Sequence, residues 1–141
     1  MPIETRRLTV SETLKILERR EGHFLDIKRK EIKPSKLSRA VSAFSNSDGG
    51  ELLIGIGENP DGSWVWDGFK DEEDANGIIQ AFETWYPLSS DLQYVFLESS
   101  DKPGLVLQIQ VLKSRDIRNA QDGIAYVRRG LNVCLKFLRS N

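Results

Sequence analysis

The sequence has little of the chemistry on which several common enzyme classes depend. Its 141 residues include one cysteine, Cys134, and one histidine, His23. A single cysteine excludes an intramolecular disulfide framework and a multi-cysteine zinc site. No nucleophile-elbow pattern surrounds His23, so a Ser-His-Asp triad is not indicated. The chain also lacks a Walker A pattern, and we expect no ATP as a cofactor.

Long apolar runs are absent as well. No segment approaches the roughly 20 apolar residues that cross a bilayer, and the N-terminus is polar and charged rather than signal-like. We therefore expect a cytoplasmic protein with no membrane partner. Hydrophobic residues make up 39% of the chain, which is enough for one real core, and no repeat or linker divides it. We expect a single domain over residues 1–141.

The net charge of −1 hides an uneven distribution of charge along the chain. Residues 1–39 carry 11 Lys/Arg against 6 Asp/Glu, residues 40–104 carry 2 against 13, and residues 105–141 carry 7 against 2. If the two basic ends meet in the fold, they form a positive face for a polyanion. The alternative is that these charges solvate exposed faces and pair with one another.

The centre of the chain has the pattern of a helix, a glycine turn and a buried strand. Residues 35–45 are predicted to form a helix with Ser35 as its N-cap. Apolar residues recur there at helical spacing, at Leu37, Ala40, Val41 and Phe44. Gly49 and Gly50 allow the chain to reverse. Residues 52–56 are predicted to form one buried strand, with Glu58 beyond its carboxyl end.

The same periodicities predict the remaining elements. We expect further helices over residues 11–20, capped by Thr9 or Ser11, and 72–85. Strands are expected over residues 24–28, 64–69, 92–98, 105–113 and 124–128, with a loop over residues 114–123. Trp64 and Trp66 share a face, which favours covering a core over stacking on bases. The structure of residues 131–141 is left open between strand and helix.

Strand alternation over residues 24–28 places Asp26 and Lys28 on one face. An acidic residue and a lysine at this spacing, joined by carboxylates from neighbouring segments, are typical of metal-dependent nucleases. Carboxylate oxygens hold Mg²⁺ or Mn²⁺, and the lysine neutralises charge on the reacting phosphate. The candidates are Glu21, Asp26 and Glu58 as metal ligands, with Lys28 beside them. The alternative is a solvated strand face.

Three motifs carry a family resemblance. They are Glu21 followed by Asp26-Ile27-Lys28-Arg29, the segment Ala43 to Gly50 followed by Leu53 to Glu58, and the late segment Asp122 to Gly130. In this order they resemble the Schlafen AlbA-type domain. The resemblance implies an α+β domain with a mixed or mainly antiparallel sheet and about three helices.

The resemblance also implies an activity and a site. Nuclease-active members of the family cleave RNA, tRNA especially, with three carboxylates supporting a divalent metal. Those positions fall on Glu21, Asp26 and Glu58. The family usually has Glu at the position of Asp26 and Asp at the position of Glu58, so both side chains differ in length by one methylene while their charge is kept.

Three hypotheses follow. The first is a metal-dependent endoribonuclease, whose nucleic-acid-binding residues are predicted to be Arg19, Arg20, Arg29, Lys30, Arg115, Arg118, Arg128 and Arg129. The second is a non-catalytic nucleic-acid-binding or regulatory module, either RNA or DNA being the ligand. The third is a protein-interaction subunit that docks through the tryptophan-bearing strand. A lobe of this size needs a homodimer to enclose a groove, so we predict a homodimer.

Overall fold

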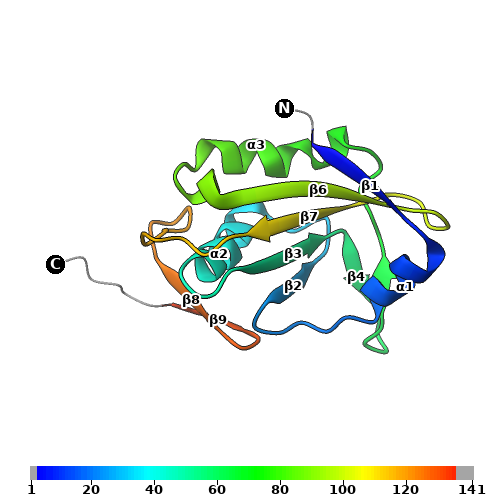
Figure 1. Ribbon diagram of the computed structural model, residues 1–141, viewed down its shortest axis with the longest axis horizontal. Helices are drawn as coiled ribbons and strands as arrows, with labels where there is room; N and C mark the ends of the chain where they lie inside the picture. Colours follow the sequence, from blue (N-terminus) through cyan, green and yellow to red (C-terminus); the bar gives the residue numbers. More distant parts are fainter. Residues whose placement is uncertain (1–2, 136–141) are drawn as a thin grey trace.

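A five-stranded mixed sheet lies at the centre of the computed structural model, which describes residues 3–135 (Figure 1). The strands lie in the spatial order β1 (Glu4–Leu8), β6 (Leu92–Ser99), β7 (Leu105–Val111), β3 (Gly50–Ile54) and β2 (Leu25–Lys28). The pairs β1/β6 and β2/β3 are parallel, whereas β6/β7 and β3/β7 are antiparallel. The predicted α+β fold and mixed sheet are confirmed.

Three α-helices and two small hairpins complete the part of the chain that the structure describes. The helices are α1 (Val10–Leu17), α2 (Pro34–Ser45) and α3 (Asn76–Thr84), with 3-10 turns η1 (Glu73–Ala75) and η2 (Leu88–Asp91) around α3. One hairpin joins β4 (Ile56–Glu58) to β5 (Trp64–Trp66), and the other joins β8 (Tyr126–Arg129) to β9 (Asn132–Leu135). Residues 136–141 of the C-terminal segment left open by the sequence lie outside the described residues.

Both faces of the central sheet are covered. Phe44 of α2 and Phe82 of α3 pack on one face, among buried residues of β3, β6 and β7. On the other face, Ile56 and Trp66 of the β4–β5 hairpin pack with Leu53 and with residues of α1. Burial on both faces explains why β3 reads as a continuous apolar run. It also leaves the polar ends of the strands as the places where a site can form.

Local signals set the helix ends. Thr9 caps α1 in a reciprocal arrangement, since its hydroxyl accepts from the Glu12 N–H and the Glu12 carboxylate accepts from the Thr9 N–H. The helix ends at Leu17, earlier than the predicted residue 20. The N-cap of α2 is Lys33, with Pro34 at the first helical position, so the prediction of Ser35 as the cap was wrong.

The predicted single strand over residues 52–56 is two strands. Gly55 has φ of 115° and ends the pairing of β3. Ile56 then starts β4, which pairs with β5 in a separate sheet. A residue with a side chain is strained at this φ, so glycine allows the chain to leave the sheet. As a result Glu58 lies in the β4–β5 hairpin rather than at the end of a central strand.

Polar side chains along α2 hold the segment that leads into β8. The Ser42 hydroxyl donates to the Arg118 carbonyl at 2.8 Å and accepts from the Tyr126 N–H at 3.0 Å. The Asn46 amide donates to the carbonyls of Arg118 and Tyr126 and accepts from the Arg118 N–H. The predicted loop over residues 114–123 is thus fixed at its backbone, because these side chains satisfy groups that no sheet ladder pairs.

Candidate functional site

The acidic candidates Glu21 and Asp26 meet at strand β2. Glu21 precedes the strand, and its Oε2 accepts from the Ile27 N–H at 2.9 Å, which holds the side chain alongside the strand. Asp26 lies within β2 and is buried, with 4% of its surface exposed. The strand alternation predicted for residues 24–28 is observed, since the neighbours Leu25 and Ile27 pack in the opposite core.

The pKa values of the two carboxyls move apart. Burial raises the pKa of Glu21 to about 7, and the neighbouring Asp26 carboxyl adds to the rise. Burial acts in the same direction on Asp26, but Glu21, Lys28 and Arg128 outweigh it and hold the pKa of Asp26 below its ordinary value. Two carboxyls that resist carrying two negative charges together form an environment that a cation stabilises.

Two cations flank Asp26. Lys28 Nζ lies 3.3 Å from Asp26 Oδ1, and Arg128 Nη1 lies 3.3 Å from Asp26 Oδ2. The Arg128 side chain is 1% exposed and also donates to the carbonyls of Gly22 and Leu25, with its guanidinium 4.5 Å from the centre of the Phe44 ring. The prediction of Arg128 as a phosphate contact does not suit this burial. Its guanidinium instead ties β8 to β2 and fixes the Asp26 carboxylate.

Glu58 and Glu21 line the same hollow. The hollow has a volume of about 420 Å³ and is lined by both glutamates together with Lys28 and Trp64. A second hollow of about 370 Å³ is lined by Asp26 and again by Lys28. Lys28 therefore shares a hollow with each of the other three residues predicted to be catalytic.

Carboxylate oxygens are the ligands that Mg²⁺ and Mn²⁺ prefer, so the donor set suits these metals. Within residues 3–135, no three Asp, Glu, His or Cys side chains lie close enough together to form a metal site as they stand. Glu21 and Asp26 are adjacent, and Glu58 lines the hollow beside them. The residues that would hold a divalent metal are these three.

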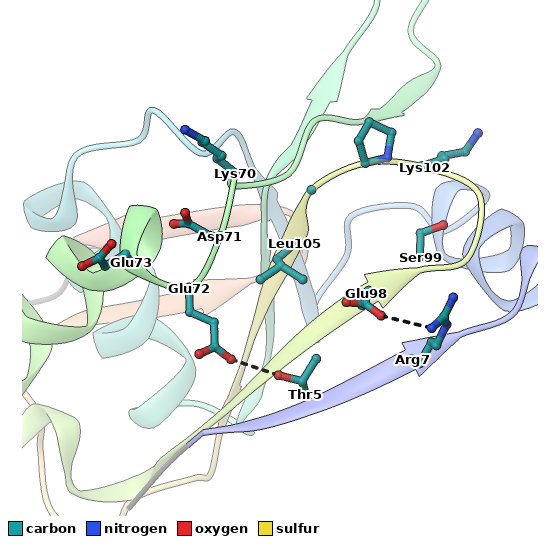
Figure 2. A pocket seen from close by; sticks show the side chains of 12 residues that line it. Thr5, Arg7, Lys70, Asp71, Glu72, Glu73, Glu98, Ser99, Lys102 and Leu105 are labelled. Atoms are coloured by element: carbon teal, nitrogen blue, oxygen red, sulfur yellow. Dashed lines mark hydrogen bonds and ion pairs between the residues drawn. The ribbon is translucent and has the colours of Figure 1, made fainter.

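A larger hollow lies elsewhere and has a more acidic lining (Figure 2). Its volume is about 810 Å³, and its lining carries four carboxylates, of Asp71, Glu72, Glu73 and Glu98, against three cations, Arg7, Lys70 and Lys102. Two of these carboxylates have partners, since Glu72 accepts from the Thr5 hydroxyl at 3.1 Å and Glu98 lies 3.8 Å from Arg7. Because carboxylates outnumber cations here, this hollow attracts a polyanion less than a basic surface does, and its size does not identify the nucleic-acid site.

Several of the arginines and lysines predicted to bind phosphate have carboxylate partners within the domain. Arg19 makes two hydrogen bonds of 3.0 Å to Glu51, and Lys30 lies 3.2 Å from Asp67. Arg118 lies 3.6 Å from Asp91 and is largely buried. These contacts favour, for these residues, the alternative that the charges pair with one another.

The remaining predicted contacts are exposed. Arg20, Arg29, Arg115 and Arg129 lie on the surface, and Arg29 lines the hollow between Glu21 and Glu58. Sequence reasoning missed two further cations in this hollow, Lys33 and Lys36 at the start of α2. Their helical spacing was visible in the sequence, but nothing there placed α2 beside β2.

The tryptophans of β5 cover the core, as the sequence favoured. Trp66 is buried, and its indole N–H donates to the Gly104 carbonyl at 3.1 Å. The Trp64 indole N–H donates to the Arg19 carbonyl at 2.9 Å. Rings held in this way are poorly available for stacking on bases or for docking a partner protein.

Comparison with known proteins gives a family and a fold. The sequence model of the family described as "Schlafen, AlbA_2" matches residues 21–133, which is most of the chain and includes all three acidic candidates. No curated protein matches this chain.

None of the helices in residues 3–135 is long and apolar enough to cross a membrane.

A solved structure has the same fold. The crystal structure of the DIP2311 protein from Corynebacterium diphtheriae is similar, with a TM-score of 0.61 and 20% sequence identity. The similarity covers 81% of this chain and 25% of that chain. At this identity the likeness establishes the fold alone, and this chain spans about a quarter of the length of that protein.

Proposed function

The chain belongs to the Schlafen AlbA_2 family, which connects it with nucleic acids, and we propose that it is a metal-dependent endoribonuclease acting on tRNA or similar structured RNA. One observation carries the proposal: the adjacent carboxyls of Glu21 and Asp26 lie beside Lys28, and Glu21 and Lys28 line one hollow together with Glu58. RNA is the substrate proposed over DNA, and the cytoplasmic location and homodimer stay predictions.

The residues have separate tasks in this proposal. Glu21, Asp26 and Glu58 hold Mg²⁺ or Mn²⁺, which supplies an activated water and stabilises the leaving oxygen when bound. Lys28 places a positive charge 3.3 Å from Asp26 and faces both hollows, where it neutralises a phosphate. Arg128 lies behind Asp26 and keeps its carboxylate in one orientation.

A non-catalytic nucleic-acid-binding module is the second candidate, and a specific observation favours it. Both oxygens of Asp26 already face cations of the protein, Lys28 and Arg128. In residues 3–135 the three carboxylates also do not form a closed group. If these cations take the place of a metal, the same surface binds RNA without cutting it.

The test is cleavage of a total tRNA pool by the purified protein with Mg²⁺, with Mn²⁺ and with EDTA. The informative variants are Glu21→Gln and Glu58→Gln, which keep size and remove charge. Asp26→Ala is less suitable, because it leaves the buried Arg128 without its partner and lowers stability. Glu31→Gln is the matched control, since Glu31 is an exposed glutamate on the same hollow.

We expect metal-dependent cutting that falls at least a hundredfold in Glu21→Gln and Glu58→Gln, on the order of the loss for a removed catalytic group. Glu31→Gln should cut like the parent. Salt-sensitive RNA binding without cutting in either metal would reject the nuclease and leave the binding module. Light scattering that gives a monomer mass at micromolar concentration would reject the homodimer.

A further inference from the structure

The two hollows beside β2 form one groove along the start of α2. Both are lined by Lys28, Ile32 and Lys36, so they meet at these residues. On the β4 side the groove reaches Glu58 and Trp64. On the other side it passes Asp26 and ends at Arg39 and Tyr126.

The charge in this groove is uneven. The side that contains Glu58 has three glutamates, Glu21, Glu31 and Glu58, against four cations, Lys28, Arg29, Lys33 and Lys36. The side along α2 carries Lys28, Lys36 and Arg39 against one carboxylate, Asp26, whose charge is offset by the buried Arg128. A polyanion is therefore attracted to the α2 side and reaches the carboxylates from there.

The cations of α2 are available for an external ligand. Lys33 and Lys36 are exposed, and within residues 3–135 neither lies within ion-pair distance of a carboxylate. Lys36 and Arg39 are three residues apart, which makes them neighbours on the helix surface. Arg39 Nε lies 3.5 Å from Asp122 Oδ2, and the Arg39 side chain is 51% exposed, so part of its guanidinium is open to solvent and can donate to phosphate.

We propose that the backbone of a nucleic-acid strand lies along the start of α2, with Lys33, Lys36 and Arg39 contacting its phosphates. The proposal rests on the proposed function for the direction in which the strand runs, toward Glu21 and Glu58. It assigns the substrate path to α2 rather than to Arg19, Lys30 and Arg118, which are paired within the domain.

The test is binding of a fluorescein-labelled single-stranded oligouridine and of total tRNA in EDTA, where metal-dependent cutting is prevented. Kd is measured by fluorescence anisotropy, or by competition for tRNA, over a range of KCl concentrations. The variant is Lys33→Ala with Lys36→Ala. The matched control is Lys70→Ala with Lys102→Ala, which removes the same charge from the rim of the acidic hollow. Circular dichroism and thermal melting check that each variant folds.

Loss of two phosphate contacts should raise Kd by about tenfold at moderate salt and flatten the slope of log K against log salt by about 1.4 for the single strand. The control pair should leave both unchanged. Lys36→Glu should weaken binding further than Lys36→Ala. If the folded Lys33, Lys36 variant keeps its affinity and salt slope, the proposal that the strand lies along α2 is rejected. An equal loss of affinity in the control pair would also reject it.

The test of this binding path is independent of the test of nuclease activity. Binding that depends on Lys33 and Lys36, together with no cutting of tRNA in either metal, would support the path along α2 and reject the nuclease activity. Metal-dependent cutting that the lysine variant retains with unchanged Kd would reject the groove and support the enzyme.

Discussion

Arg128 is the residue that joins the most distant parts of the candidate site. Its guanidinium contacts Asp26 and the carbonyls of Gly22 and Leu25, while its backbone N–H donates to the Ser47 hydroxyl at 2.9 Å. It therefore connects β8, β2 and the end of α2. A buried carboxylate with a well-placed guanidinium is costly to break from one side, because the remaining charge stays buried.

We predict that Arg128→Met lowers the free energy of unfolding by about 3 kcal/mol or more, the usual cost of removing one partner of a buried ion pair. Arg129→Met is the control, since Arg129 is exposed and an exposed substitution changes stability by about 0.5 kcal/mol or less. Urea unfolding of both variants is the measurement. Equal midpoints for the two variants would mean that the contact with Asp26 does not hold the site.

Tyr94 gives a second prediction at the scale of single residues, on how the stability of the fold depends on pH. It packs against the core, its hydroxyl is without a hydrogen-bond partner among the described residues, and burial raises its pKa to about 12. An unfolded tyrosine has a pKa near 10. The Tyr94 hydroxyl therefore loses its proton more readily in the unfolded chain than in the folded one. Its contribution to the free energy of unfolding is constant below pH ~10 and falls as the pH rises toward ~12.

Tyr94→Phe should remove this pH-dependent loss. We expect the urea midpoint of the parent to fall relative to that of Tyr94→Phe between pH ~10 and ~12. Near neutral pH the variant should be at least as stable, since it lacks an unpaired hydroxyl. Tyr86→Phe is the control, because Tyr86 is 78% exposed. A parallel fall in all three proteins would show that Tyr94 ionises freely in the folded state.

At the scale of elements, α2 does more than supply an apolar face. One side packs Leu37, Val41 and Phe44 into the core. Ser38, Ser42 and Asn46 bind the backbone of the segment from residue 118 to residue 126. This segment leads to Arg128, so the polar side of α2 sets where the guanidinium meets Asp26.

Ser42→Ala tests this arrangement. It leaves the buried Tyr126 N–H without its acceptor, while the Arg118 carbonyl keeps the Asn46 amide, and an unsatisfied buried group costs about 1–3 kcal/mol. The matched control is Ser35→Ala in the first turn of the same helix, whose hydroxyl has no hydrogen bond among the described residues. Hydrogen exchange should also rise in residues 114–128 of Ser42→Ala alone. Unchanged exchange there would mean that the loop is held by other contacts.

Sequence periodicity predicted the elements better than it predicted their partners. Local spacing, which the sequence contains, sets the helices, the hairpin of β6 and β7, and the alternation of β2 side chains between the two faces of the sheet. The break at Gly55 was missed because a glycine inside an apolar run suits a bulge or a strand end equally well. The charge pairs Arg19 with Glu51 and Arg128 with Asp26 join residues far apart in the chain, so no local pattern indicates them.

At the scale of the whole molecule, the basic and acidic parts of the chain occupy different regions. The basic first third supplies β2 and the cations at the start of α2. The acidic middle third supplies the rim of the hollow at Glu72 and Glu98. The basic last third meets the first third through the buried Arg128, which pairs with Asp26.

This separation predicts a one-sided footprint for bound nucleic acid. Hydrogen-exchange mass spectrometry in EDTA, with and without single-stranded oligouridine, should show slower exchange over residues 28–40. The segment from Asp71 to Thr84 should exchange at the same rate in both samples, because its carboxylates repel the strand. A sample with Lys33→Ala and Lys36→Ala at the same oligouridine concentration controls for effects of added polyanion. Protection of α3 in place of the start of α2 would contradict this placement, since the strand would then lie beside the four consecutive acidic residues 71–74 that precede α3.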